Sequence, residues 1–220
     1  MTESSIIAIS ISATALLVSL ITAWVTLFRR GKLKMTQPTT VMFGPDGPHH
    51  EGDPKIYLRS LLYSTAKRGH VIENMFVRLS RGEHRQNFPI WVLGNERLSR
   101  GSGIFVGEQG VVANHHFLLP PDAEKYFFKA GEYRLDVFAR IVGASQAALL
   151  WTNSLTISEA DATKLTQPNN AIYFDWGPDS NRYISHVKSK PPNPMPNAMI
   201  EIFGNALQTE RLSRESGKKK

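Results

Sequence analysis

Two pairs of adjacent histidines are the side chains whose type and spacing most readily suggest chemistry. His49 and His50 stand beside Glu51 and Asp53 in the stretch GPDGPHHEGDP, and imidazole nitrogens and carboxylate oxygens are common ligands of divalent metals. The surrounding glycines and prolines predict a loop, where ligands can be gathered freely. Residues 44–53 therefore leave open a metal centre or a hydrolase site, although an ordinary polar loop explains the same composition.

His115 and His116 form the second pair, within a stretch that predicts a β-strand, VVANHHFLL. Successive side chains of a strand point to opposite faces of its sheet. A regular strand cannot direct both imidazoles to one ion, so this pair does not by itself indicate a metal site.

Two aspartates, Asp46 and Asp179, each follow a Gly-Pro dipeptide, in FGPDG and WGPDS. Carboxylates on two rigid turns could act as a general acid and a general base if the turns met in space. Gly-Pro-Asp is also common turn chemistry, because proline fixes φ and aspartate bonds nearby backbone amides. We favour the turn interpretation for both residues.

Other catalytic signatures are missing from the 220 residues. The sequence has no cysteine, which excludes thiol catalysis and thiolate metal sites and fits a reducing compartment. It also contains no phosphate-binding loop, no G-x-S-x-G elbow and no H-E-x-x-H motif. We therefore expect a protein that is not an enzyme and that has no cofactor and no bound metal.

The first element of the chain is a long apolar stretch. Residues 6–28 contain no charged residue, no proline and no glycine. A helix of 23 residues rises about 35 Å, which exceeds a hydrocarbon core of about 30 Å. The preceding residues 1–5 carry only Glu3 and lack the basic start of a signal peptide. The stretch therefore predicts a single transmembrane helix that the mature protein retains.

Basic residues follow this stretch, whereas its N-terminal flank is acidic. The positive-inside rule then places the N-terminus outside and the rest of the chain in the cytoplasm, at the cell (inner) membrane. An indole one turn before the basic flank fits the membrane interface. The residues that we expect at this interface are Trp24, Arg29, Arg30, Lys32 and Lys34.

Small side chains recur along one face of the same stretch, at spacings of four and three residues. Such stripes allow two membrane helices to approach closely. They indicate a helix-packing face for a homo-oligomer or another anchor, formed by Ala8, Ser12, Ala15, Ser19 and Ala23.

The net charge of +7 is unevenly distributed. Residues 38–187 hold fifteen basic and fifteen acidic side chains, so the excess lies in residues 1–37 and 188–220. Because these central residues carry no net charge, they do not indicate the basic surface that nucleic-acid binding requires. Basic residues beside an anchor are instead attracted to anionic lipid headgroups, which we expect as a partner.

In the middle of the chain, apolar and polar residues alternate with a period of two rather than with the period of a helix. Its clearest strand is residues 131–142, in which Tyr133, Leu135 and Val137 share one face. Turn-forming residues separate it from comparable runs at 55–64, 71–80, 86–93, 111–119 and 148–158, and from shorter ones at 39–43 and 104–106. Seven or eight short strands with frequent turns predict a mainly β protein, an antiparallel sandwich.

The run AGEYRLDV at residues 130–137 resembles the penultimate strand of immunoglobulin-like and fibronectin-III-like domains. That resemblance implies that Tyr133 bonds backbone at a sheet corner and that residues 149–157 form the final strand. The inter-sheet cysteine pair of the immunoglobulin family is missing here. The whole chain also resembles uncharacterised bacterial single-pass membrane proteins, a resemblance that implies no activity.

Beyond the sandwich the composition changes. The stretch EADATKL at residues 159–165 predicts a short helix, with Ser158 as N-cap and Asp161 three residues later. Residues 171–176, AIYFDW, are expected to pack back on the sandwich. Four prolines between residues 191 and 196 then predict an extended linker.

The chain therefore divides into six segments: a tail (1–5), a transmembrane helix (6–28), a basic juxtamembrane linker (29–37), a β-sandwich (38–158), an extension that packs on it (159–187), and a Pro-rich, then basic tail, largely disordered (188–220). We interpret the whole as a membrane-anchored, non-enzymatic binding or scaffold protein that presents a cytoplasmic sandwich to a protein partner. The alternatives are an envelope-facing ligand-binding domain of reversed topology, and a hydrolase or metal protein that uses residues 44–53.

Overall fold

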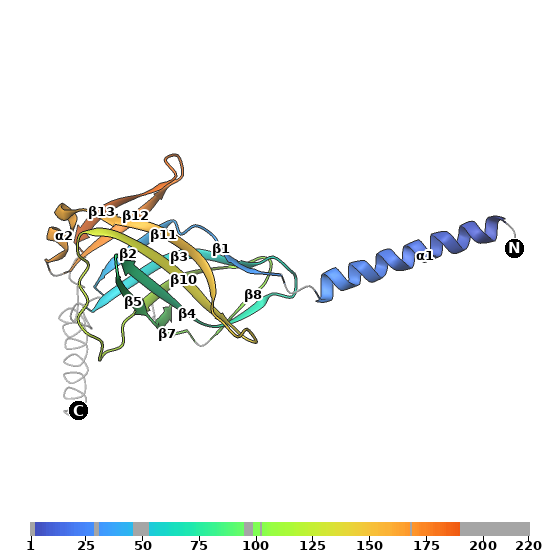
Figure 1. Ribbon diagram of the computed structural model, residues 1–220, viewed down its shortest axis with the longest axis horizontal. Coiled ribbons are helices and arrows are strands. Elements are labelled where there is room, and N and C mark those ends of the chain that lie inside the picture. The colour runs from blue at the N-terminus through green and yellow to red at the C-terminus, as the bar shows by residue number, and fades with distance from the viewer. Residues whose placement is uncertain are drawn as a thin grey trace, which may run out of the picture.

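The computed structural model describes residues 3–28, 31–45, 53–94, 99–101, 103–167 and 169–189. An apolar helix forms the N-terminal part, and two antiparallel β-sheets follow it (Figure 1). The expected mainly β sandwich preceded by one helix is thus confirmed.

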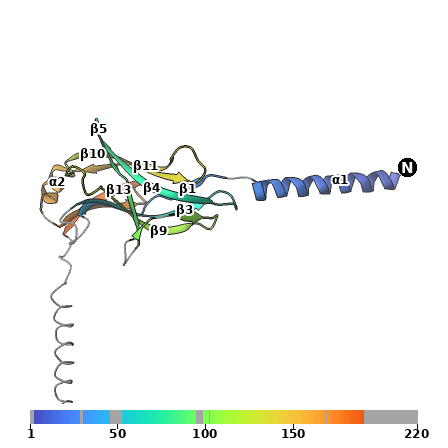
Figure 2. The same cartoon turned by 90° about the horizontal axis from the view of Figure 1, so that it is seen from below.

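Helix α1 (Glu3–Ala23) continues into a single π-helical turn, η1 (Trp24–Phe28). No side chain of α1 is buried, and the helix extends away from one end of the sandwich (Figures 1 and 2). Four of its serine and threonine hydroxyls donate to carbonyl oxygens four residues earlier, which satisfies them without water. These bonds, 2.8–2.9 Å long, join Ser10 to Ile6, Thr14 to Ser10, Ser19 to Ala15, and Thr22 to Val18.

Length and composition make this helix able to cross a membrane. The 24 residues Glu3–Thr26 have a mean hydropathy of 2.3 in their most apolar window, and none of that window is buried against the rest of the protein. It is the one helix of the described residues with these properties.

The larger sheet has eight strands in the order β13-β12-β2-β3-β9-β6-β7, with β1 paired to β3. Their bounds are β1 (Leu33–Met35), β2 (Thr40–Pro45), β3 (Pro54–Ser64), β6 (Ile90–Leu93), β7 (Ser99–Arg100), β9 (Val111–Leu118), β12 (Asn170–Gly177) and β13 (Arg182–Ser189).

The smaller sheet has five strands in the order β11-β10-β4-β5, with β8 paired to β4. Its strands are β4 (His70–Arg81), β5 (His84–Phe88), β8 (Ile104–Val106), β10 (Gly131–Ile141) and β11 (Ala148–Ile157). One short helix, α2 (Glu159–Leu165), connects β11 to β12.

The order of the strands is that of an immunoglobulin-like sandwich. In chain order, β2, β3, β6 and β9 take the places of strands A, B, D and E, and β4, β10 and β11 those of C, F and G. Strands β12 and β13 extend the first sheet beyond strand A. The alternating pattern explains the core, since one face of β10 places Tyr133, Leu135, Val137 and Ala139 in the interior.

Tyr133 forms the sheet corner that the resemblance implied. Its ring is fully buried, and its hydroxyl donates to the Lys129 carbonyl oxygen at 2.7 Å and accepts from the Lys129 amide at 2.8 Å. Burial, opposed by the bond to Lys129, raises the pKa of this phenol. The corner therefore fixes the connection that leads into β10.

Three boundaries differ from the sequence expectation. Residues 86–93 form two strands in different sheets, because Pro89 lacks the N–H that a continuous ladder needs. The larger sheet begins at β1, inside the expected linker 29–37, because Leu33 and Met35 are apolar enough to be buried. Residues 171–176 do not merely pack on the sandwich, since they belong to β12 within the sheet.

The cap of α2 agrees with the expectation. The Ser158 hydroxyl accepts from the Asp161 amide at 3.1 Å and donates to the Asp161 carboxylate at 2.9 Å. At the other end of α2, the Asn170 side chain donates to the Lys164 carbonyl at 2.8 Å. Both ends of this short helix are therefore fixed to the sandwich.

Replacing Tyr133 by phenylalanine tests the corner. Y133F keeps the buried ring but removes both bonds to Lys129, so we expect the free energy of unfolding to fall by about 1–2 kcal/mol. Chemical denaturation in detergent, followed by near-UV circular dichroism, measures this loss.

Tyr57→Phe is the matched control, because the Tyr57 hydroxyl makes a 3.2 Å bond to a side chain, Asn114, rather than to backbone. Equal losses in the two variants would contradict the assigned role of the corner.

Candidate functional site

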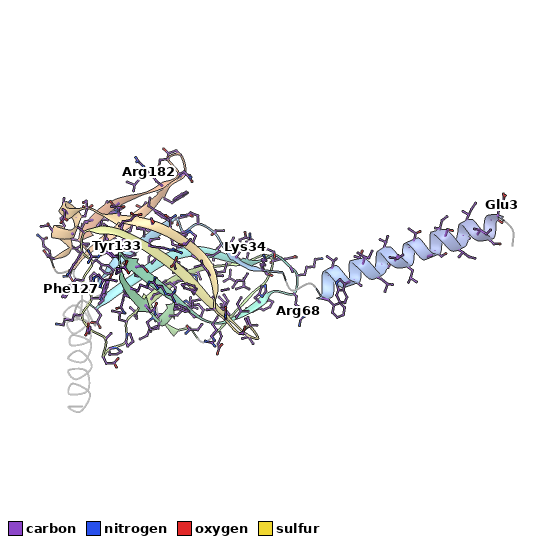
Figure 3. All side chains as sticks on the ribbon, in the orientation of Figure 1. Glu3, Lys34, Arg68, Phe127, Tyr133 and Arg182 are labelled. Carbon is purple, nitrogen blue, oxygen red and sulfur yellow. The ribbon has the colours of Figure 1, made fainter. Side chains whose placement is uncertain are left out.

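Three of the interface residues expected from the sequence are described, and they lie near the junction between helix and sandwich. Trp24 is exposed and stacks on Phe28 with ring centroids 5.2 Å apart. Lys32 and Lys34 are exposed beside the junction (Figure 3). Arg29 and Arg30 lie outside the described residues.

The expected helix-packing face lies on α1, where Ala8, Ser12, Ala15, Ser19 and Ala23 are all exposed. Their association with a second helix stays a prediction.

His115 is fully buried between the two sheets. The Trp91 indole N–H donates to His115 Nδ1 at 3.1 Å, so the neutral ring carries its proton on Nε2. Nε2 is also buried, and no described residue accepts a hydrogen bond from it. Burial, with a smaller effect of His116, lowers the pKa of His115 to about 4.

The two histidines of this pair do point to opposite sides of the sheet. His116 lies on the outer face, where its ring is 5.0 Å from that of Tyr57. In the loop that contains the other histidine pair, His49, His50 and Glu51 lie outside the described residues, while Asp53 is exposed. Among the described residues, no group of three histidine, aspartate or glutamate side chains is placed to hold a metal ion.

The described residues of the two Gly-Pro-Asp stretches lie at different ends of β12. Asp46 lies outside the described residues, but Pro45 before it pairs with Pro54, at the end where β12 begins. Asp179 stands in the turn after Gly177, at the other end of β12. The eight residues of β12 place Gly177 about 24 Å from the strand end beside Pro45.

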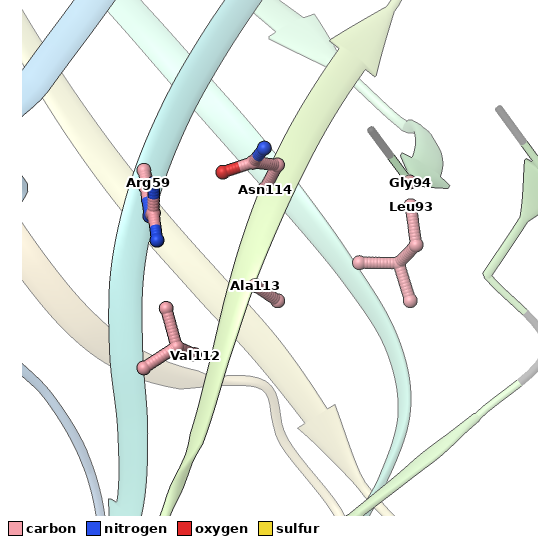
Figure 4. A pocket seen from close by; sticks show the side chains of 6 residues that line it. All are labelled: Arg59, Leu93, Gly94, Val112, Ala113 and Asn114. Carbon is pink, nitrogen blue, oxygen red and sulfur yellow. The ribbon is translucent and has the colours of Figure 1, made fainter. Parts of the chain in front are cut away.

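Two hollows lie on the outer faces of the sheets. One, of about 250 Å³, lies between β3, β9 and β6, where Arg59, Asn114 and Leu93 surround it (Figure 4). It is smaller than most ligand pockets.

The other outer hollow, of about 480 Å³, lies on the smaller sheet and is polar. Two of its charges pair with each other: Asp136 Oδ1 accepts from Arg134 Nε at 3.0 Å, and it also accepts from the Thr152 hydroxyl at 2.6 Å. This network explains how a nearly buried carboxylate is kept in the sheet.

The largest of these three hollows is a groove of about 690 Å³. It lies at the end of the sandwich opposite α1, where Figure 3 labels Phe127 of its lining. We call it the distal groove. Residues 126–130 of the segment before β10 form one wall and α2 forms another, and its floor includes Gly44 and the adjoining prolines. Its apolar lining residues are Pro45, Pro54, Tyr126, Phe127, Phe128, Ala130, Ala162 and Leu165.

Aromatic packing holds the first wall. Phe128 stacks on the core ring of Phe43 at 5.1 Å, and Tyr126 packs edge-on against Phe88 at 5.9 Å. Phe127 comes between these two residues in sequence, but its own side chain points outward and is 68% exposed. An exposed phenylalanine on a fixed backbone is the kind of side chain that a partner can bury at low entropic cost.

Gly44 allows the floor to form. A Cβ atom at this position would lie 2.5 Å from the Ala171 Cβ, so any larger residue would push β2 away from β12.

The rim of the groove is polar. It carries Lys129 and Glu159 together with the amides and hydroxyls of Thr163, Thr166, Gln167, Asn169 and Asn170. Burial, above all, raises the pKa of Tyr126 and keeps its phenol protonated. A site of this size, with apolar walls and a few polar groups, is typical of binding.

Sequence reasoning did not single out this groove. The sequence feature that could have indicated it is a run of three aromatic residues, YFF at 126–128, shortly before the Tyr133 corner. It was missed because the other walls come from α2 and β2, which are distant in sequence.

No protein-family model matches the chain, and no curated protein matches it. Its function is therefore argued from its own residues.

The buried histidine predicts a pH effect on stability. An unfolded histidine has a pKa of about 6.5, so between pH 6.5 and 4 the unfolded chain binds more protons than the folded chain does. The contribution of His115 is therefore complete above this window and is lost as the pH falls through it, by roughly 3 kcal/mol in total.

His115→Gln removes this titration and keeps an acceptor for Trp91. We expect the stability advantage of the wild type over H115Q to shrink between pH 7 and 4, as measured by denaturation in detergent at several pH values. Replacement of exposed His84 by glutamine should leave the wild-type profile unchanged. Parallel profiles for H115Q and wild type would contradict the burial effect.

Proposed function

We propose that the protein is a membrane-anchored, non-enzymatic binding module that holds an apolar segment of a protein partner in its distal groove. Helix α1 is the anchor, with its basic flank at the cytoplasmic surface of the cell (inner) membrane. The sandwich is the rigid body that carries the groove into the cytoplasm.

The observation that carries this proposal is the exposed Phe127 on the wall of an apolar groove. Its neighbours Tyr126 and Phe128 are anchored in the core, so the wall is formed before any partner arrives. Preformed apolar sites lose little conformational entropy on binding. The amides and hydroxyls of the rim can then pair with the backbone of the bound segment.

Binding fits the groove better than catalysis does. Apart from Lys129 and Glu159, the polar groups of the rim are amides and hydroxyls, which orient a ligand but do not exchange protons readily near neutral pH. The one strongly shifted imidazole that the structure describes, His115, lies between the sheets and does not line the groove.

The position of the groove suits a tethered module. It lies at the far end of the sandwich from the anchor, so a partner can reach it without meeting the bilayer (Figure 3). The fixed ends of α2 keep the second wall in place.

Reporter fusions at the C-terminus test the orientation. We expect an active cytoplasmic reporter and an inactive periplasmic one, because the basic flank stays inside. Moving the charge, with Thr2→Lys and Glu3→Lys together with Arg29→Gln and Arg30→Gln, should shift part of the population to the opposite orientation. An active periplasmic reporter on the wild type would instead favour the envelope-facing domain.

A photo-crosslinking residue at Phe127 tests the groove. In cell membranes we expect it to form a covalent adduct with one protein, whose crosslinked segment mass spectrometry identifies as apolar. The same residue at Ile184, which is also exposed but lies on β13, is the matched control.

Affinity for the identified segment then decides the outcome. Phe127→Ala should weaken binding to the full-length protein by about tenfold or more, the usual loss for an aromatic hot spot, whereas Ile184→Ala should not. Equal affinities for wild type and F127A would refute the assigned site.

A further inference from the structure

Three exposed apolar side chains gather at the end of the sandwich from which α1 leaves. They are Val71, Phe105 and Val142, which are 44%, 60% and 61% exposed. Val71 and Phe105 face each other across the β4–β8 ladder, and the Val142 amide donates to the Val71 carbonyl at 2.9 Å. The three therefore form one patch over adjacent chain segments, which we call the proximal patch.

Basic side chains lie at the same end of the sandwich as this patch. The turn between β3 and β4 carries Lys67 and Arg68, both exposed, and Gly69 of the same turn contacts the Phe105 ring (Figure 3). Lys32 and Lys34 lie on the strand side of the same junction. Two acidic side chains also lie on these segments: Glu108 in the neighbouring turn, and Glu73 on β4, which forms an ion pair with Arg140 at 3.6 Å.

The junction holds this end close to the helix. The Lys32 amide donates to the Thr65 hydroxyl at 2.7 Å, and the Thr65 amide donates to the Lys32 carbonyl at 3.0 Å. Gly31 has a φ of +64°, and a Cβ there would lie 2.6 Å from the Ala66 Cβ. The backbone after the helix is therefore bound to the basic turn.

The reach of the chain limits the height of the patch above a bilayer. Three Cα–Cα steps of about 3.8 Å join Phe28 to Gly31, so at most about 11 Å separates these two atoms. The headgroup layer on each side of a bilayer is roughly 5–8 Å thick. If α1 spans the membrane, the basic turn must lie within the headgroups or directly above them.

We propose that the proximal patch docks on the membrane surface: Val71, Phe105 and Val142 enter the headgroup layer, and Lys67 and Arg68 bind anionic headgroups. This proposal rests on the proposed anchoring by α1. Its occupant is the bilayer because the patch is continuous with the anchor and its charge is complementary to anionic lipid.

The absence of cysteine from the sequence gives a clean experiment. Phe105→Cys in the full-length protein takes a single environment-sensitive fluorophore, and Phe127→Cys, at the other end of the sandwich, is the matched control with similar exposure. Both are placed in nanodiscs of phosphatidylcholine, alone or mixed with phosphatidylglycerol. The readouts are the emission wavelength and quenching by aqueous iodide and by spin-labelled lipid.

We expect the probe at position 105 to emit at shorter wavelength than the probe at 127, with several-fold weaker iodide quenching and strong quenching by lipid. The effect should be larger with phosphatidylglycerol and should fall when Lys67→Glu and Arg68→Glu are added. Equal iodide quenching at 105 and 127 would overturn the proposal.

A protein partner and a failed anchor each give a distinct result in the same experiment. Protection of position 105 that appears only after a cell extract is added would overturn the proposal in favour of a protein partner. Failure of the full-length protein to co-elute with nanodiscs would refute the anchor itself, and is thus distinguishable from a failure of docking alone.

Discussion

A short, bound junction is the constraint on which the arrangement of this protein depends. Only residues 29 and 30 separate the end of the apolar helix from Gly31, whose close contact with Ala66 leaves no room for a side chain. The two hydrogen bonds between Lys32 and Thr65 then fix the chain to the turn between β3 and β4. The sandwich therefore begins within a few residues of the end of the helix, and its first residues are bonded to the turn between β3 and β4.

This constraint gives the two ends of the sandwich different roles. Once α1 is taken as a membrane anchor, the end with Phe105 and Arg68 must face the bilayer, and the end with Phe127 must face away from it. The apolar residues of the first end then meet lipid, and the distal groove stays accessible to a partner. One connection thus accounts for two exposed apolar surfaces that would otherwise be costly in a soluble domain.

Much of the fold could be predicted from local patterns. Alternation identified most strands, and the capping pair Ser158 and Asp161 located α2. The corner at Tyr133 was implied by the resemblance of residues 130–137 to a strand of immunoglobulin-like domains. What could not be predicted depends on pairing between distant segments. Strand β12 enters the sheet beside β2, and β1 extends the same sheet, because register and neighbours are set by the shared core and not by either sequence alone. The same limit applies to the site. The alternation of side chains along a strand predicted that His115 and His116 point to opposite faces of the sheet. The groove could not be predicted, because it forms only where α2, β2 and residues 126–128 come together in the fold.

The central claim is that the sandwich is held against the membrane with its groove directed away. Neutron reflectometry of the full-length protein in a supported bilayer measures this arrangement directly, as the profile of protein density along the membrane normal. The structure predicts that protein density begins at the headgroups without an intervening water layer and extends outward by the length of the sandwich. A water-filled gap between the headgroups and the protein would contradict it.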